Sequence, residues 1–187
     1  MSEEITKNPE RLAVLARIEE YEKNGWWHKD VEDDPPTIPL KPEQIDYLNE
    51  RLPNKIMNYF VNRKGAKFIN GLIDSGAMVI KEVRGFENYR RLADTGAIIT
   101  CNHFNAFDNF AVWKVIEGEL AREKRALWKV IREGNYTNFP GFYGLLFRHC
   151  NTLPLSSSFA TMRLFMEAIN TLLARGEKIL IYAEQGM

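Results

Sequence analysis

The second half of the chain alternates short apolar runs with segments of helical spacing, and this alternation constrains the fold more than any other feature. The runs with the length and composition of strands are residues 77–83, 97–101, 126–130, 152–155 and 178–183. Helical spacing is found between them, at residues 107–118 and 157–175. Strands that alternate with helices form βα units, whose strands pair in parallel. We therefore predict an α/β fold with a mixed, largely parallel sheet flanked by helices.

The segment 157–175 is the clearest helix in the sequence. Its apolar residues recur at helical spacing and form one face, which we assign to the core: Phe159, Met162, Phe165, Met166, Ile169, Leu172 and Leu173. Residues 156–158 are three serines that can cap its first turn, and Gly176 follows its last turn.

The first 75 residues predict an N-terminal helical extension, and residues 76–187 the α/β domain. A helix over residues 9–23 precedes a proline-rich, acidic arm, in which Trp26 and Trp27 are expected to anchor the arm on the domain or on a membrane interface. Residues 42–73 are helical, apolar and basic, and Gly65 is expected to divide them into two helices. This stretch is typical either of a helix packed on the domain's own core or of one lying among lipid headgroups.

Composition excludes several classes of protein. The sequence has 25 basic and 25 acidic side chains, so its net charge gives no argument for binding nucleic acid. Only Cys101 and Cys150 are present, without a CxxC spacing, which predicts neither a disulfide framework nor a structural metal and fits a reducing cytosol. The first residues are polar and acidic rather than those of a secretory signal, and no apolar stretch has the 18 or so residues that a membrane-spanning helix needs.

Polar residues with catalytic potential follow the run 97–101 directly. The sequence continues Asn102-His103-Phe104-Asn105-Ala106-Phe107-Asp108, and a helix is expected to begin near Asp108. On one continuous helix, side chains five residues apart point about 140° away from each other, so His103 and Asp108 can meet only across a turn. If they meet, the carboxylate orients the imidazole, which can then accept a proton near neutral pH and return it to a leaving group.

The surroundings of this stretch resemble the lysophosphatidic acid acyltransferase family, the PlsC-like glycerolipid acyltransferases of the 1-acyl-sn-glycerol-3-phosphate acyltransferase type. The family signature NHxxxxD follows a hydrophobic strand, as it does here at Asn102 to Asp108. Residues 144–155, GLLFRHCNTLPL, are similar to its second block, and residues 180–187, LIYAEQGM, to its third. The resemblance extends from about Val83 to Met187.

This resemblance implies a peripheral enzyme on the inner, cytoplasmic face of the membrane. It implies transfer of an acyl group from acyl-CoA or acyl-carrier protein to a lysophospholipid hydroxyl, without a metal or other cofactor and without a covalent acyl-enzyme. His103 would be the general base and Asp108 would orient it. The residues that we expect to bind substrate are Asn102, Asn105, Arg132, Arg148, Glu184, Gln185 and Gly186. Family members continue past the third block, so we expect the natural domain to continue beyond Met187.

Several positions depart from the family pattern. Asn105 stands where serine is commoner, Ala183 replaces a proline, and Gln185 is inserted between glutamate and glycine. Ser156 and Ser157 follow the second block where the family has an aspartate and an arginine. In the family this arginine is taken to hold the acceptor phosphate. Arg148 and Arg163 are candidates to replace it, and both are also typical of solvated surface residues.

Two alternatives remain open at the level of the sequence. The same scaffold can serve as a non-catalytic lipid-binding module, or as a thioester hydrolase in which water replaces the lipid hydroxyl. The remaining histidines, His28 and His149, are typical of structural positions, and the basic run from Arg122 to Arg132 is typical of a solvated helix end and loop.

Overall fold

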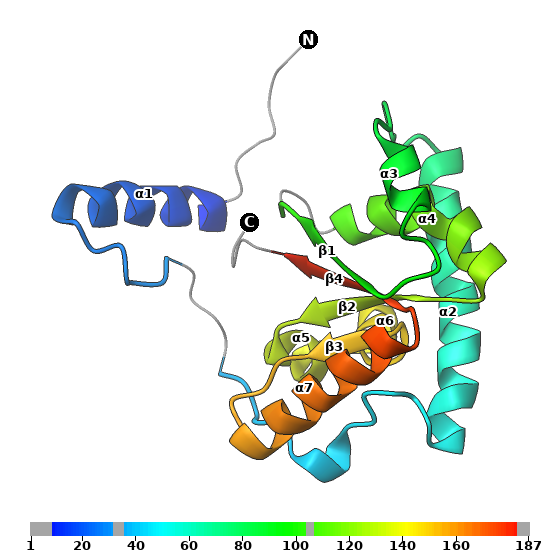
Figure 1. Ribbon diagram of the computed structural model, residues 1–187. Coiled ribbons are helices and arrows are strands. Elements are labelled where there is room, and N and C mark those ends of the chain that lie inside the picture. The colour runs from blue at the N-terminus through cyan, green and yellow to red at the C-terminus, as the bar shows by residue number, and fades with distance from the viewer. Residues whose placement is uncertain (1–8, 32–35, 104–106, 183–187) are drawn as a thin grey trace. The chain divides into compact units, whose positions relative to one another are not determined.

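The computed structural model describes residues 9–31, 36–103 and 107–182 (Figure 1). The chain forms two compact units, one up to residue 36 and the other from Thr37 onward. In the first unit, helix α1 (Pro9–Asn24) ends at Gly25, whose positive φ of 67° closes the predicted helix. Trp26 packs edge-on against Tyr21 and lies under the ammonium group of Lys29, whereas Trp27 is exposed.

The second unit is built on a parallel sheet of four strands. These are β1 (Ala97–Cys101), β2 (Leu127–Ile131), β3 (Thr152–Pro154) and β4 (Lys178–Tyr182), in the order β1-β4-β2-β3. All three pairings in the described residues are parallel, so every strand ends at the same edge of the sheet. The predicted α/β class is confirmed, with four of the five expected strands within one or two residues of their predicted bounds.

The strand predicted at residues 77–83 is wrong. Val79 and Val83 are exposed, and no strand in the described part of the chain pairs with this segment. A β-strand is stabilised by hydrogen bonds to a neighbouring strand and by packing against it. The apolar content of a segment does not reveal whether such a neighbour exists. The segment instead forms an irregular link from Gly76, which has a positive φ of 73°, to the short helix α3 (Phe86–Arg90).

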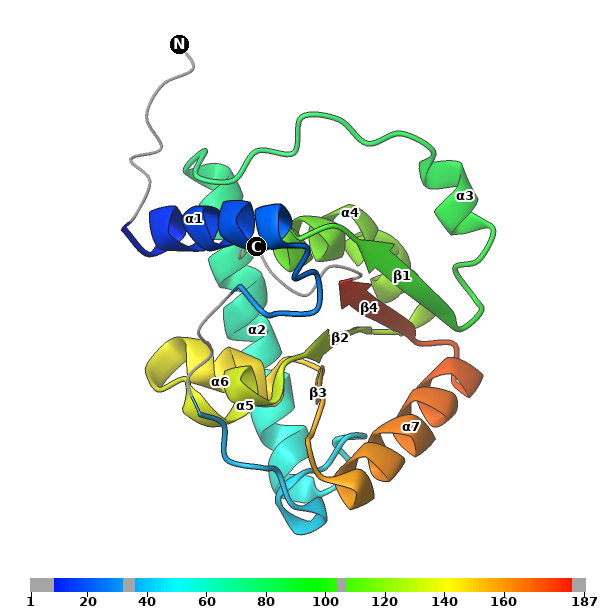
Figure 2. The same ribbon diagram turned by 90° about the vertical axis from the view of Figure 1, so that its left-hand side faces the viewer.

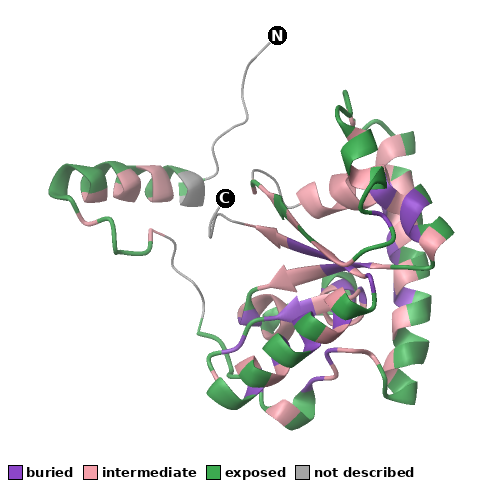
Figure 3. Cartoon of the chain, in the orientation of Figure 1, coloured by how far each residue is buried: buried purple, intermediate pink, exposed green. Residues whose placement is uncertain are grey.

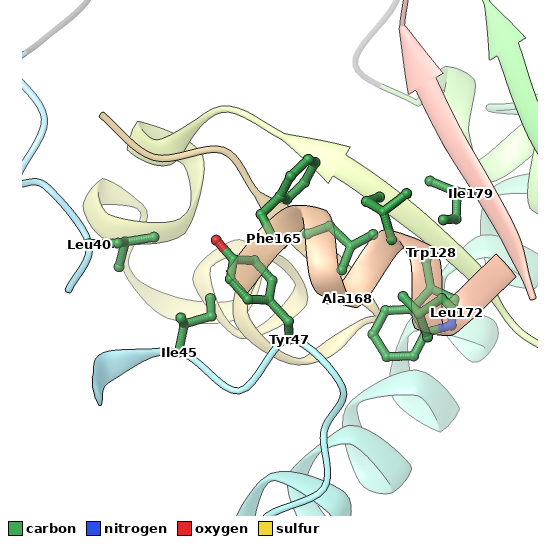
Figure 4. Close-up of a cluster of buried hydrophobic side chains, with 10 residues drawn as sticks. Leu40, Ile45, Tyr47, Trp128, Phe165, Ala168, Leu172 and Ile179 are labelled. Carbon is green, nitrogen blue, oxygen red and sulfur yellow. The ribbon is translucent and has the colours of Figure 1, made fainter. Parts of the chain in front are cut away.

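Each face of the sheet is covered by a different helix. Successive strand residues point to opposite faces, so Leu127 and Leu180 pack with α4 (Asp108–Glu123), whereas Trp128 and Ile179 pack with α7 (Phe159–Ala174). Figure 4 shows the core on the α7 side. It also contains Leu40, Ile45 and Tyr47, so the segment before α2 is part of the sheet's core.

Helix α2 (Leu52–Asp74) is continuous and runs beside α6 (Gly141–His149), as Figure 2 shows. The predicted break at Gly65 is therefore wrong. A Cβ added at Gly65 would lie 3.4 Å from both the Cys150 sulfur and Leu146, an ordinary contact distance, so this glycine packs towards α6 within the continuous helix. A 3₁₀ turn (Pro42–Gln44) precedes α2, and the helix α5 (Glu133–Asn138) precedes α6.

The end of α7 at Gly176 is confirmed by a positive φ of 82° at that residue. One of the three predicted cap candidates, Ser158, occupies the N-cap position of α7, but its side chain makes no capping hydrogen bond. None of the helices in the described part of the chain combines the length and hydropathy that crossing a bilayer requires.

Candidate active site

The candidate site lies at the edge of the sheet where the parallel strands end. In open α/β sheets this edge is where ligands bind. Strand β1 ends at Cys101, Asn102 and His103 follow, and α4 begins at Asp108 after Phe107. Residues 104–106, which were predicted to turn between the histidine and the helix start, lie outside the described residues. Asp108 occupies the first turn of α4, where the helix dipole favours a negative charge.

His103 and Asp108 are in contact, although five positions separate them in sequence. The Nδ1 atom of His103 lies 3.4 Å from the Oδ2 atom of Asp108, and each side chain is 25% exposed. When Nδ1 carries the ring proton it donates to the carboxylate, and Nε2 is then left with a lone pair that can accept a proton. The pair therefore has the geometry of an oriented base that solvent can reach.

Tyr182 packs against the face of the His103 imidazole. Its ring stacks on His103 with centroids 4.1 Å apart and planes 13° apart. Tyr182 is the last residue of β4 and lies opposite Cys101 in the ladder, so the pairing of β1 with β4 creates this contact. Burial, with the nearby Cys101 and Asp108, raises the pKa of the Tyr182 phenol far above its ordinary value, so the hydroxyl stays neutral.

Cys101 is close to the pair but is poorly suited to act as a nucleophile. Burial raises the pKa of its thiol, and the neighbouring Asp108 raises it further. The thiol donates to the carbonyl oxygen of Asn102 at 3.1 Å. Because the reactive form of cysteine is the thiolate, the surroundings favour chemistry in which Cys101 stays protonated.

Comparison with known proteins identifies the family of the chain. A protein-family model described as Acyltransferase matches residues 81–186, which is more than half of the chain and includes the His103–Asp108 pair. The chain belongs to the acyltransferase family. No significant match was found among curated proteins or among solved structures. Membership identifies a transferase that moves an acyl group from a donor to an acceptor, and leaves the subfamily open.

The other residues predicted to bind substrate are placed in different ways. In this acyltransferase Asn102 is exposed beside His103, and Arg132 is exposed at the N-cap of α5, after β2. Arg148 instead donates from its guanidinium to the carbonyl oxygens of Tyr136, at 3.4 Å, and Phe139, at 3.1 Å. These bonds connect α6 to α5 and to the residue that follows it.

Four predicted substrate-binding residues lie outside the described residues. They are Asn105, Glu184, Gln185 and Gly186. Among the described residues of the acyltransferase, no group of three or more His, Cys, Asp or Glu side chains is arranged to hold a metal ion.

A buried carboxylate occupies the same edge of the sheet, after β2 and β3. Glu133 accepts hydrogen bonds from the Ser156 hydroxyl at 2.6 Å, the Leu40 amide at 2.7 Å, and the hydroxyl and amide of Ser157 at 3.1 and 3.3 Å. Burial by itself would raise the pKa of Glu133, but these four donors together hold it below the ordinary value. At the position where the family pattern has the phosphate-binding arginine, this acyltransferase has Ser157, which donates to the carboxylate of Glu133.

Sequence reasoning missed Tyr182 and Glu133. Tyr182 was included only as part of a strand, because its contact with His103 depends on which strand lies beside β1. Glu133 follows Arg132 directly, and a single acidic residue after a strand is a weak signal. Its four donors come from two distant segments, around residues 40 and 157.

Proposed function

We propose that the protein transfers a fatty acyl group from acyl-CoA or acyl-carrier protein to the hydroxyl of a lysophospholipid such as lysophosphatidic acid. It would act as a peripheral protein on the cytoplasmic, inner face of the membrane. The observation that carries the proposal is the contact of His103 with Asp108, within a chain whose family transfers acyl groups. Asn102, which adjoins the base in sequence, Arg132 and Arg148 are the described residues proposed to bind substrate.

The proposed reaction uses His103 twice. Nε2 accepts the proton of the acceptor hydroxyl while the hydroxyl oxygen attacks the thioester carbonyl, forming a tetrahedral intermediate. When the carbon–sulfur bond breaks, the imidazolium returns the proton to the leaving thiolate, giving an ester and a free thiol. Asp108 stabilises the imidazolium between the two transfers and keeps Nδ1 as the protonated nitrogen. Tyr182 limits rotation of the ring by stacking on it.

Direct transfer is favoured over a covalent acyl-enzyme at Cys101. The raised pKa of that thiol keeps the thiolate population small at neutral pH. The acyl group would therefore pass from donor to acceptor in one enzyme-bound complex.

The test is release of free thiol from acyl-CoA by the purified protein, with and without a lysophospholipid. Acyl transfer predicts release that depends on the acceptor and matches the amount of diacyl product. Equal release in both conditions, with free fatty acid as product, would instead identify a hydrolase. If no thiol is released from acyl-CoA or acyl-carrier protein with any lysophospholipid offered, the catalytic proposal is wrong.

A further inference from the structure

Helix α2 carries two apolar stripes, although it packs on the protein through only one. Val61, Gly65 and Ile69 recur at helical spacing and are buried. Val61 and Gly65 face Leu146 of α6 and Cys150 at its C-terminal end. The second stripe comprises Leu52, Ile56, Tyr59 and Phe60, and at 3.6 residues per turn it points to the opposite side of the helix. Leu52, Tyr59 and Phe60 are 70%, 58% and 57% exposed. Figure 3 shows this exposure over much of the first half of α2.

The charge along α6 and along α2 up to Ile73 has a single sign, whereas Asp46 and Glu50 precede α2 and Asp74 ends it. Between Arg51 and Ile73 the sequence has five Lys and Arg residues and no Asp or Glu, and α6 has no acidic residue either. Arg63 and Lys67 continue the exposed side of α2 beyond Phe60. Lys55, Arg63, Lys64 and Lys67 are exposed, and none of them forms an ion pair within the part of the chain that the structure describes.

A groove lies beside these lysines. Its volume is about 430 Å³, and its lining is mostly apolar with two ammonium groups: Lys64, Lys67, Phe68, Gly71 and Leu72 from α2, and Phe142 from α6. Phe68 packs edge-on against Phe142 at 5.4 Å and against Phe110 of α4 at 6.0 Å. Phe110 in turn stacks on Phe107, the residue before Asp108. The groove is therefore linked by a row of aromatic contacts to the turn of the candidate active site.

We propose that this surface docks on an anionic phospholipid bilayer. We call it the α2–α6 face, and it consists of Leu52, Ile56, Tyr59, Phe60, Arg63, Lys64, Lys67 and Phe142. The apolar and aromatic residues would enter the boundary between headgroups and acyl chains, while the basic residues contact lipid phosphates. Charge complementarity selects an anionic bilayer as the partner, because the face offers several cations and no carboxylate. This inference rests on the proposed function, because docking would bring the lipid substrate to the row of aromatic rings that ends beside Asp108.

Co-sedimentation of the full chain with vesicles tests the proposal without requiring turnover. We expect binding to vesicles that contain phosphatidylglycerol and phosphatidylcholine, and much weaker binding to phosphatidylcholine alone. Raising the salt concentration to about 1 M shortens the screening length to about 3 Å and should release most of the protein. If the protein does not sediment with anionic vesicles at low salt, the proposal is wrong.

Variants locate the binding surface. Replacing Arg63, Lys64 and Lys67 together by alanine should weaken binding about 10²-fold, since each basic residue near an anionic surface contributes about fivefold. Tyr59→Ser with Phe60→Ser should also abolish most binding. The matched control is Phe159→Ser with Met166→Ser on α7, which removes two exposed apolar side chains elsewhere and should bind as the wild type does. Equal loss in the control would refute the assignment of the face.

A measurement on the wild-type protein makes the test independent of folding in the variants. Acetylation of Lys64 and Lys67 should slow when anionic vesicles are added, whereas Lys124, exposed at the end of α4, should react unchanged. Unprotected Lys64 and Lys67 on bound protein would overturn the proposal. The proposal would also be overturned if the Tyr59→Ser, Phe60→Ser variant lost self-association but kept vesicle binding. The face would then join two copies of the chain. His103→Ala should bind vesicles normally, so loss of transfer with retained binding concerns only the proposed reaction.

Discussion

At the scale of single residues, the orientation of His103 depends on two neighbours with different kinds of contact. Asp108 fixes the nitrogen that carries the proton, and Tyr182 fixes the plane of the ring. The Tyr182 hydroxyl is buried and has no hydrogen-bond partner among the described residues. The ring of Tyr182 therefore stabilises the position of His103, whereas its buried hydroxyl lowers the stability of the fold. Two substitutions can separate these effects.

Tyr182→Phe should keep kcat near the wild-type value and raise the free energy of unfolding by about 1 kcal/mol, because it removes an unsatisfied polar group and keeps the stacked ring. Tyr182→Ala should lower kcat about tenfold, since loss of stacking, about 0.5–1.5 kcal/mol, lets the imidazole rotate. Steady-state kinetics and thermal unfolding of both variants check this. An alanine variant with wild-type kcat would show that Tyr182 has no positioning role.

Glu133 should make stability depend on pH. Its pKa is held below the ordinary value of 4.5, so its contribution is fully present above about that pH and is lost as the pH falls through the lower folded-state pKa. Glu133→Gln should lower the free energy of unfolding at pH 7 by about 2 kcal/mol or more and flatten its dependence on pH below 4.5. Denaturant titrations from neutral to acidic pH measure both effects.

The control for Glu133 is Glu167→Gln on α7. Glu167 is exposed and lies 3.7 Å from Arg163, an arrangement that contributes little to stability. If the Glu167 and Glu133 variants lose the same acid sensitivity, the buried network around Glu133 is not its source.

At the scale of elements, the packing of α6 depends on two glycines that differ in the space around them. A Cβ at Gly65 of α2 would make ordinary contacts at 3.4 Å with Leu146 and Cys150. A Cβ at Gly144 of α6 would overlap the carbonyl oxygen of Phe139. The first glycine leaves room for a methyl group, and the second does not.

Gly65→Ala should therefore raise the free energy of unfolding by about 0.5–1 kcal/mol, because alanine favours the helix and restricts the unfolded chain. Gly144→Ala should lower it by about 1–3 kcal/mol, since the backbone has to shift. Urea titrations of the two variants, read with the same probe, provide the comparison. Destabilisation by Gly65→Ala would mean that α2 and α6 lie closer together than the structure shows.

The elements that sequence reasoning predicted correctly are those with a local signal. Strand β1 and helix α7 have apolar periodicity that their own residues display, and both were expected at nearly their observed bounds. The failures at residues 77–83 and at Gly65 depend on partners far along the chain. Local sequence does not show whether a segment finds a neighbouring strand, or whether a glycine inside a helix packs on another helix instead of ending its own.

At the scale of the whole molecule, the segment before α2 is part of the core of the sheet unit. Leu40, Ile45 and Tyr47 are buried against α7, and the Tyr47 hydroxyl donates to the carbonyl oxygen of Pro154 at 2.8 Å. Burial of three such side chains contributes roughly 4–9 kcal/mol, which is comparable to the total stability of a typical domain.

Removal of residues 1–36 should leave the sheet unit folded, whereas removal of residues 1–48 should unfold it. The first deletion ends where the two compact units divide, and the second removes the three core side chains. Circular dichroism and thermal unfolding distinguish the two outcomes. A cooperative transition in the shorter protein would show that residues 37–48 are dispensable for folding.

The site was predictable to the extent that it is local in sequence. The NHxxxxD stretch predicted the contact of His103 with Asp108, because both lie within seven consecutive residues. Tyr182 entered the site through the pairing of strands about 80 residues apart, and the Glu133 network formed where two distant loops meet. Neither arrangement has a signature in a single sequence.

The central claim is that His103 acts as the base of an acyl transfer. It is tested most directly by kcat/KM for thiol release from acyl-CoA in the presence of lysophospholipid, measured for the wild type, His103→Ala and His28→Ala. His28 is exposed in the first unit and serves as the matched control. We predict a fall of about 10²- to 10⁴-fold for His103→Ala and no change for His28→Ala. A His103→Ala protein within tenfold of the wild type would contradict this account.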